Sequence, residues 1–173
     1  MATRPPGIGT VRHAFLASIL SLAFLIPGGA AADAGDETRL VAVRAAGAPA
    51  PQSAPILCTV EVGGGPGQGL LTVDFFGRNR CGPEPAASMT GQARLLTNIG
   101  TPAASGNRFA CGPCHIGGSA GSFFPAVPGT SYTVVYDTRV TLPPGHIFGT
   151  IPAGCSGVGT ATATCTLRRS ITA

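Results

Sequence analysis

The sequence predicts an all-β fold, a small disulfide-stapled β-sandwich that follows a cleaved signal peptide. Three observations predict it. Several short segments are rich in β-branched and aromatic residues, 26 glycines and 16 prolines interrupt the chain too often for helices, and six cysteines follow an export signal. The sandwich is expected to occupy residues 56–173 as one domain.

The first 32 residues have the organisation of a secretory signal peptide. Two arginines precede an apolar run over residues 14–26, and small residues follow it, so cleavage is expected between Ala32 and Asp33. The 13-residue run is shorter than the stretch of about 20 residues that crosses a bilayer. We therefore expect a secreted protein, held at the cell surface at most, with no stable membrane anchor.

Residues 33–55 read as a flexible linker. The segment begins with acidic residues and becomes rich in Ala, Pro, Gly and Ser from Ala45 to Pro55, without apolar periodicity. Residues 40–43 could add only an edge strand.

The strand candidates combine β-branched or aromatic residues with period-two alternation. They are residues 56–62, 70–76, 91–97, 107–110, 131–142 and 160–167. The segment 131–142 is the clearest, because Tyr, Thr and Val suit a half-buried pleated surface. The glycine-rich segment 63–69 is expected to be a loop, and no stretch beyond the leader has a helical period.

The charge of the chain argues against a nucleic-acid partner. Without the leader, nine arginines stand against seven acidic residues, and the chain has no lysine. Only Arg78/Arg80 and Arg168/Arg169 form tight basic pairs. Two pairs do not make the basic stripe of a nucleic-acid-binding surface.

All six cysteines lie in the expected domain, and an even number in an exported chain indicates disulfides. Six cysteines allow 15 pairings. We expect the local pattern, in which each cysteine bonds to the next along the chain, partly because Cys155 and Cys165 flank a turn that could place them opposite each other in a hairpin. The expected bonds are Cys58–Cys81, Cys111–Cys114 and Cys155–Cys165.

The motif Cys111-Gly-Pro-Cys114-His115 matches two chemical signatures besides a structural bridge. Read as C-x-x-C-H, it is a c-type haem attachment site with His115 as axial ligand. Read as C-G-P-C, it is a thioredoxin-like redox site, which requires a helix after the motif. Glycines and serines follow His115 instead, so the sequence favours a structural disulfide in a loop.

Two further catalytic or metal patterns are weak. The segment around Ser119 matches G-x-S-x-G, with Asp137 and His146 downstream, but the chain lacks the βαβ pattern of the hydrolase fold. Cys111, Cys114, His115 and His146 could formally bind zinc, although an oxidising compartment favours disulfides. We expect no metal and no cofactor.

The C-terminal third, residues 132–167, resembles a family of bacterial surface repeats with immunoglobulin-like modules. The matching residues are Val140, Leu142, Pro143, Gly145, Cys155, Gly157, Cys165 and Leu167. Arg139 departs from the acidic residue that the family has near that point, and the module occurs once in this chain. The resemblance implies an immunoglobulin-like β-sandwich that serves as a spacer or adhesive module, with no catalytic residues.

Taken together, these features predict a non-enzymatic structural or interaction module at the cell exterior, with an extracellular protein or a cell-envelope component as partner. Two alternatives remain open. One is a thiol–disulfide or c-type haem protein that uses Cys111, Cys114 and His115. The other is a secreted inhibitor or ligand binder, with residues 111–127 as an exposed loop.

Overall fold

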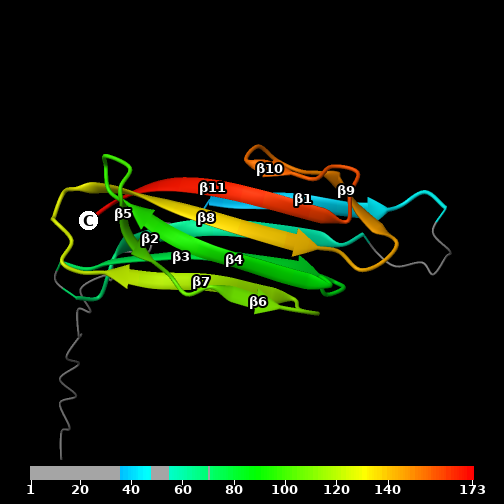
Figure 1. Ribbon diagram of the computed structural model, residues 1–173, viewed down its shortest axis with the longest axis horizontal. Helices are drawn as coiled ribbons and strands as arrows, with labels where there is room; N and C mark the ends of the chain where they lie inside the picture. The colour runs from blue at the N-terminus through cyan, green and yellow to red at the C-terminus, as the bar shows by residue number, and fades with distance from the viewer. Residues whose placement is uncertain (1–35, 48–54, 70) are drawn as a thin grey trace, which may run out of the picture.

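The chain forms two β-sheets that pack face to face (Figure 1). The structure, a computed structural model, describes residues 36–47, 55–69 and 71–173. In these ranges the chain contains eleven β-strands and no α-helix. The predicted all-β sandwich is therefore confirmed. The predicted signal peptide, residues 1–32, lies outside the described residues.

The first sheet has five antiparallel strands in the order β7-β3-β2-β1-β9. These strands are β1 (Asp36–Arg44), β2 (Leu57–Pro66), β3 (Val73–Gly82), β7 (Ile116–Phe123) and β9 (His146–Thr150). The long register between β2 and β3 brings Cys58 opposite Cys81.

The second sheet has six strands in the order β10-β11-β8-β4-β5, with β6 also paired to β4. These strands are β4 (Ser88–Leu96), β5 (Pro102–Ser105), β6 (Phe109–Cys111), β8 (Ser131–Thr141), β10 (Cys155–Ser156) and β11 (Thr162–Thr172). Strand β8, the clearest prediction from the sequence, is central and pairs with both β4 and β11.

The pairing of five strands matches part of the immunoglobulin pattern. From β3 the chain crosses to β4, returns to β7 beside β3 and crosses again to β8 beside β4. It then returns to the five-stranded sheet as β9 and ends with β11 beside β8. An immunoglobulin sandwich also pairs strands B and E in one sheet and C, F and G in the other. There strand G follows F directly, whereas β9 and β10 lie between β8 and β11 in this chain. Strands β3, β4, β7, β8 and β11 thus take the places of B, C, E, F and G.

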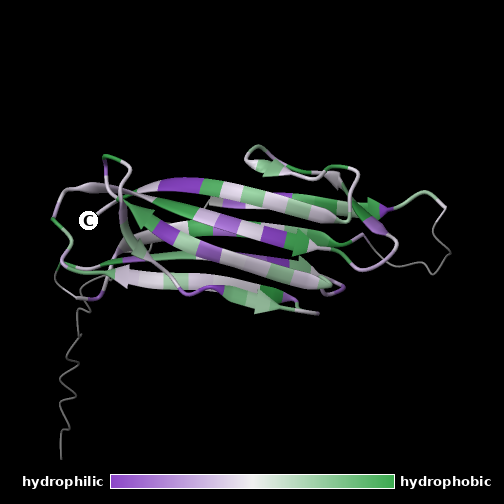
Figure 2. Ribbon diagram, in the orientation of Figure 1, coloured by the Kyte–Doolittle hydropathy of each residue, from purple (hydrophilic) through white to green (hydrophobic). Residues whose placement is uncertain are grey.

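The core lies between the sheets, where alternate residues of each strand point inward. Figure 2 shows this alternation as changing hydropathy along the strands. The largest fully buried side chains include Tyr136 on β8 and Phe75 on β3. A Cβ atom at Gly77 would lie 2.0 Å from a ring carbon of Tyr136. Glycine at this position therefore lets the tyrosine ring of one sheet lie directly against the other.

The three predicted disulfides are confirmed as Cys58–Cys81, Cys111–Cys114 and Cys155–Cys165. The first joins paired residues of β2 and β3, and the third joins paired residues of β10 and β11. Each of these two bonds stays within one sheet. They fasten neighbouring strands, whereas the characteristic immunoglobulin disulfide joins the two sheets.

The prediction of a flexible linker over residues 33–55 is wrong for residues 36–44, which form β1. This strand is an interior one, bonded to β2 on one side and β9 on the other. Leu40 and Ala42 are fully buried, while Glu37 and Arg39 point outward. The short alternation at residues 40–43 therefore marked a core strand. Residues 48–54 lie outside the described residues.

Two glycine-rich segments form strands, although their sequences predict loops. Strand β2 continues through residues 63–65 to Pro66, and β7 contains Gly117, Gly118 and Gly121. The missing side chains make room for large neighbours. A Cβ atom at Gly117 would lie 2.3 Å from the ring of Phe109, and one at Gly121 would lie 2.6 Å from the ring of Phe75. Glycine here is a packing requirement between the layers, which local propensity does not reveal.

Candidate functional site

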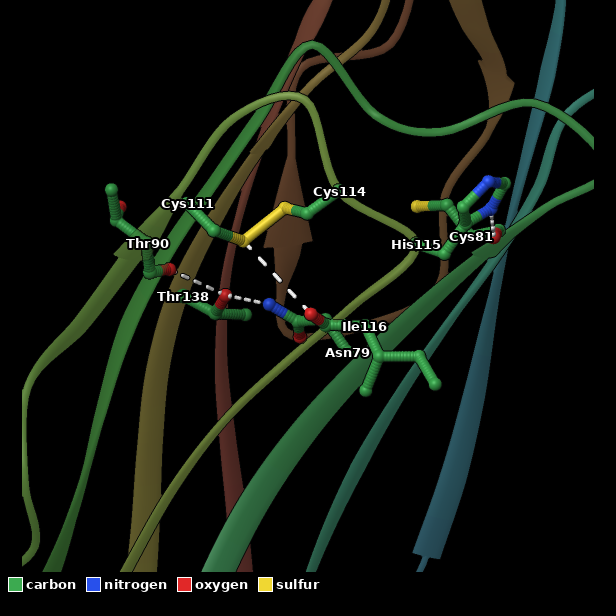
Figure 3. Close-up of a disulfide and its surroundings, with 8 residues drawn as sticks. All are labelled: Asn79, Cys81, Thr90, Cys111, Cys114, His115, Ile116 and Thr138. Carbon is green, nitrogen blue, oxygen red and sulfur yellow. Dashed lines mark hydrogen bonds between the residues drawn. A yellow bond between two sulfur atoms is a disulfide. The ribbon is translucent and has the colours of Figure 1, made fainter.

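The Cys111–Cys114 corner contains the motif that the sequence singled out as the strongest chemical candidate (Figure 3). Cys111 ends β6, and Cys114 exchanges two backbone hydrogen bonds of 3.0 and 3.1 Å with Ala86. His115 Nδ1 lies 3.1 Å from the carbonyl oxygen of Cys81. The corner is thus tied by backbone contacts to β3 and to the segment that precedes β4.

This corner is the disulfide that solvent reaches most directly. Both Cys111 and Cys114 are partly exposed, whereas Cys58, Cys81 and Cys165 are buried. Access and a thiolate are the two requirements for thiol–disulfide exchange. The exposed bridge meets the first requirement, so the second decides how reactive it is.

The element that follows the motif is a strand. Strand β7 begins at Ile116, directly after His115. A thioredoxin-like site places its first cysteine at a helix amino terminus, whose dipole lowers the pKa of the thiol. Here the backbone after the motif is extended, so the motif is not followed by a helix whose dipole could activate a thiol. A covalently attached haem would need both sulfurs, which the disulfide uses.

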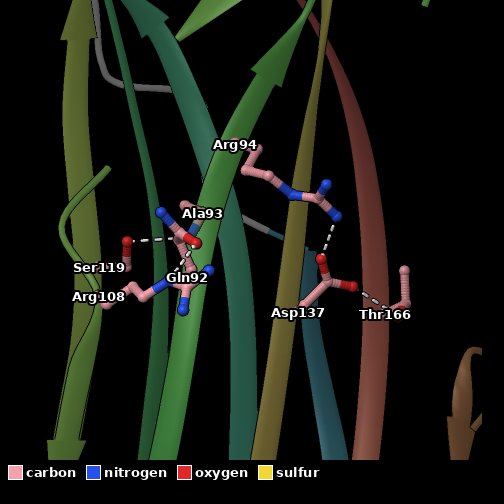
Figure 4. Close-up of polar contacts among 7 residues, drawn as sticks. All are labelled: Gln92, Ala93, Arg94, Arg108, Ser119, Asp137 and Thr166. Carbon is pink, nitrogen blue, oxygen red and sulfur yellow. Dashed lines mark hydrogen bonds and ion pairs between the residues drawn. The ribbon is translucent and has the colours of Figure 1, made fainter. Parts of the chain in front are cut away.

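The structure does not bring Ser119, Asp137 and His146 together. Ser119 points into the core, is 2% exposed, and its Oγ accepts a 2.9 Å hydrogen bond from the backbone N–H of Ala93 (Figure 4). Asp137 lies on the outer face of the other sheet, bonded to Arg94 and Thr166. His146 begins β9. The serine therefore closes the gap between β7 and β4, and a strand replaces the sharp turn of a nucleophile elbow.

The four residues considered for zinc do not form a metal centre in the described chain. The sulfurs of Cys111 and Cys114 bond to each other, and His115 faces a backbone carbonyl. Among the described residues, no three His, Cys, Asp or Glu side chains are grouped as potential ligands.

A polar network on the outer face of the six-stranded sheet was not anticipated from the sequence (Figure 4). Asp137 on β8 binds Arg94 of β4, and its other oxygen accepts a 2.7 Å hydrogen bond from Thr166 of β11. Arg108 donates to Gln92 at 3.0 Å. These residues become neighbours through strand register, which the sequence does not specify. A shallow cleft of about 240 Å³ opens beside them, lined by Thr90, Gly91, Gln92, Arg108, Phe109 and Asp137.

Two further clefts lie along β3. One, of about 330 Å³, is lined mainly by β3 and β7 around Phe76, Arg78 and Ala120. The other, of about 300 Å³, is polar and includes Glu61, Arg78 and Arg80. Arg78 separates the two, since it bonds Glu61 at 2.7 Å and lies 5.9 Å above the ring of Phe76. These surfaces offer shallow binding positions and no arranged nucleophile, acid and base.

Comparisons with protein-family models, curated proteins and solved structures find no match for this chain. Within the described residues, no helix is long and apolar enough to cross a membrane.

Proposed function

We propose that this protein is an exported, disulfide-stapled immunoglobulin-like module that acts by binding or spacing at the cell exterior, without catalysis. The observation that carries the proposal is that all six cysteines are paired, two of the bonds directly between neighbouring strands. Such bonds persist in oxidising compartments, which agrees with the leader in the sequence. The partner would be an extracellular protein or a component of the cell envelope.

The residue environments support a binding role. Ser119 is buried and bonded to a backbone amide, and the outer faces present shallow clefts with ion pairs. Loops at the ends of an immunoglobulin sandwich are frequent recognition sites. The resemblance of residues 132–167 to bacterial surface repeats points the same way.

Thiol–disulfide exchange is the second candidate, favoured by the exposure of both Cys111 and Cys114. An insulin-reduction assay on the secreted protein, with dithiothreitol as the electron donor, distinguishes the binding module from a thiol–disulfide exchange protein. The module proposal expects the wild-type chain and a Cys111→Ser/Cys114→Ser variant to give the same rate. A rate above background that the variant loses would establish the redox function. An absorption spectrum of the same sample should lack the Soret band of a haem.

A further inference from the structure

The excess positive charge of the described chain lies on one face of the sandwich. The described residues contain nine arginines and six acidic residues. Four of these arginines and one of the acidic residues lie on the outer face of the six-stranded sheet, which gives this face a net side-chain charge of +3, while the remaining five arginines and five acidic residues balance. We call Arg94, Arg108, Arg139 and Arg168 the arginine face, whose one acidic residue is Asp137.

Strand register spaces the arginines across this face. Arg94 pairs with Val135, and Val135 pairs with Arg168, so the two arginines lie two strands apart, or about 10 Å. Arg139 follows Val135 by four residues on β8, about 13 Å along the strand. Arg108 reaches the same face beside β4, where it donates to an outward-facing glutamine (Figure 4). The charges are therefore spread over the face, which suits a partner that carries several acidic groups.

Three of the four arginines have no acidic partner. Asp137 binds Arg94, but in the described chain no ion pair includes Arg108, Arg139 or Arg168. The hydrogen bond of Arg108 goes to a neutral amide, and all four guanidinium groups belong to exposed residues. A guanidinium group binds carboxylate, sulfate and phosphate oxygens with two parallel hydrogen bonds. The face can thus receive several acidic groups of one partner at the same time.

The outer face of the five-stranded sheet provides a contrast, because its charges balance. Arg39 lies 3.3 Å from Glu37, and Arg78 lies 2.7 Å from Glu61. Three basic and three acidic side chains point outward here, namely Arg39, Arg78, Arg80, Glu37, Glu61 and Asp74. Positive charge is therefore a property of one face and does not extend over the whole surface.

The side chains between the arginines are polar. Thr90, Thr164 and Thr166 are exposed on the arginine face, and Val135, which points the same way, is only 2% exposed. None of the described large apolar residues that are exposed lies on β4, β8 or β11. Insertion into a bilayer and a typical protein interface both need exposed apolar side chains, and single-stranded nucleic acid needs exposed aromatic rings. A hydrated polymer rich in hydroxyl groups needs none of these.

The shallow cleft at the edge of this face has the groups that bind a sugar. Its volume is about 240 Å³, and its lining includes Arg108, Asp137, Gln92 and Thr90 beside the partly buried ring of Phe109. Together these side chains offer hydrogen-bond donors and acceptors for hydroxyl groups and one aromatic surface for the apolar face of a sugar ring. A few placed polar groups beside an aromatic ring are the usual composition of a small-ligand site.

We propose that the arginine face binds a linear acidic polysaccharide, with one sugar unit in the cleft and acidic groups of the neighbouring units on Arg139 and Arg168. The inference rests on the proposed function, since it names the class of partner that the exported module would bind. Charge complementarity supplies the attraction, and the threonine hydroxyl groups supply contacts to the uncharged parts of the polymer.

Binding to defined polysaccharides tests the proposal. The secreted full chain is immobilised and its affinity is measured by biolayer interferometry for polygalacturonate, dextran sulfate and neutral dextran of similar length. We expect binding to one or both acidic polymers, no binding to dextran, and weaker binding as the salt concentration rises. The two acidic polymers show whether the face prefers carboxylate or sulfate groups.

Variants with matched charge locate the binding face. Arg139→Gln/Arg168→Gln should weaken binding to the preferred acidic polymer by about tenfold or more. Arg39→Gln/Arg80→Gln removes two exposed arginines from the outer face of the other sheet and should leave the affinity within about twofold of the wild type. The two variants have the same net charge, so a difference between them reports position.

Three results would overturn the proposal. The wild type could bind neither acidic polymer, the two variants could lose binding equally, or duplex DNA or phosphatidylglycerol vesicles could bind the same arginines more tightly than either polysaccharide. Free thiols, a bound haem or insulin reduction in the same preparation would instead contradict the proposed function, so the two failures are distinguishable.

Discussion

Asn79 on β3 and Thr138 on β8 connect the two sheets through a 2.6 Å hydrogen bond from Asn79 Nδ2 to Thr138 Oγ1 (Figure 3). Thr138 also bonds to β4, because its hydroxyl donates a 2.8 Å hydrogen bond to the carbonyl of Thr90. Strands β3 and β8 take the places of strands B and F, which an antibody domain joins by a disulfide. Buried hydrogen bonds therefore connect the two strands that correspond to those linked by a disulfide in antibody domains.

The first prediction concerns this connection. Thr138→Val keeps the shape of the side chain but leaves the buried amide of Asn79 without its acceptor. We expect the free energy of unfolding to fall by about 1–3 kcal/mol in urea denaturation. Thr164→Val, on an exposed position of β11, should change it by less than about 0.5 kcal/mol. Equal effects from the two variants would show that the buried hydrogen bond contributes nothing specific.

The second prediction concerns the disulfides. In the chain-entropy model, longer closed loops give more stabilisation, and the three bonds span sequence separations of 23, 10 and 3 residues. Replacing Cys58 and Cys81 by alanine should reduce stability by about 3 kcal/mol or more, while replacing Cys111 and Cys114 should cost about 2 kcal/mol. Thermal unfolding of the two double variants measures the order, and the reverse order would contradict the model.

The third prediction concerns the contact between Gly77 and Tyr136. Because a Cβ atom at Gly77 would overlap the tyrosine ring, Gly77→Ala must separate the sheets or displace the ring. We expect a loss of about 3 kcal/mol. Gly65→Ala provides the control, since a Cβ atom there meets nothing within 4 Å. A tolerated Gly77→Ala would mean that the two sheets are not packed as closely as described.

The fourth prediction concerns alkaline pH. Burial raises the pKa of Tyr136 from 10.0 to about 12. The unfolded tyrosine therefore loses its proton first as the pH rises, and stability that is fully present below pH 10 is lost between about pH 10 and 12. The expected loss is about 2–3 kcal/mol. Tyr136→Phe should remove this part of the slope, and an unchanged slope would show that Tyr136 does not cause it.

Predictions from the sequence succeeded where the residues of a single strand show the alternation that is typical of a strand. The alternation in 131–142 and 160–167 marked β8 and β11, and the local cysteine spacing indicated all three disulfides. The predictions failed where packing against residues of other strands determines the structure. Strand β7 is extended because its glycines receive the rings of Phe75 and Phe109, and that contact depends on residues distant in the sequence.

The candidate sites divide in the same way. The Cys111–Cys114 bridge could be found because both cysteines lie in one short motif. The network around Asp137 could not, since strand register brings its residues together. Residue types give a list of candidates, and the topology selects among them.

The intact mass of the secreted protein, measured before and after reduction and alkylation, tests the central claim most directly. We predict a chain that starts at Asp33, is six hydrogens lighter than its reduced form, and accepts six alkyl groups only after reduction, as three disulfides require. A mass increased by a haem, or two cysteines that are alkylated without reduction, would contradict the account and make Cys111 and Cys114 the active feature.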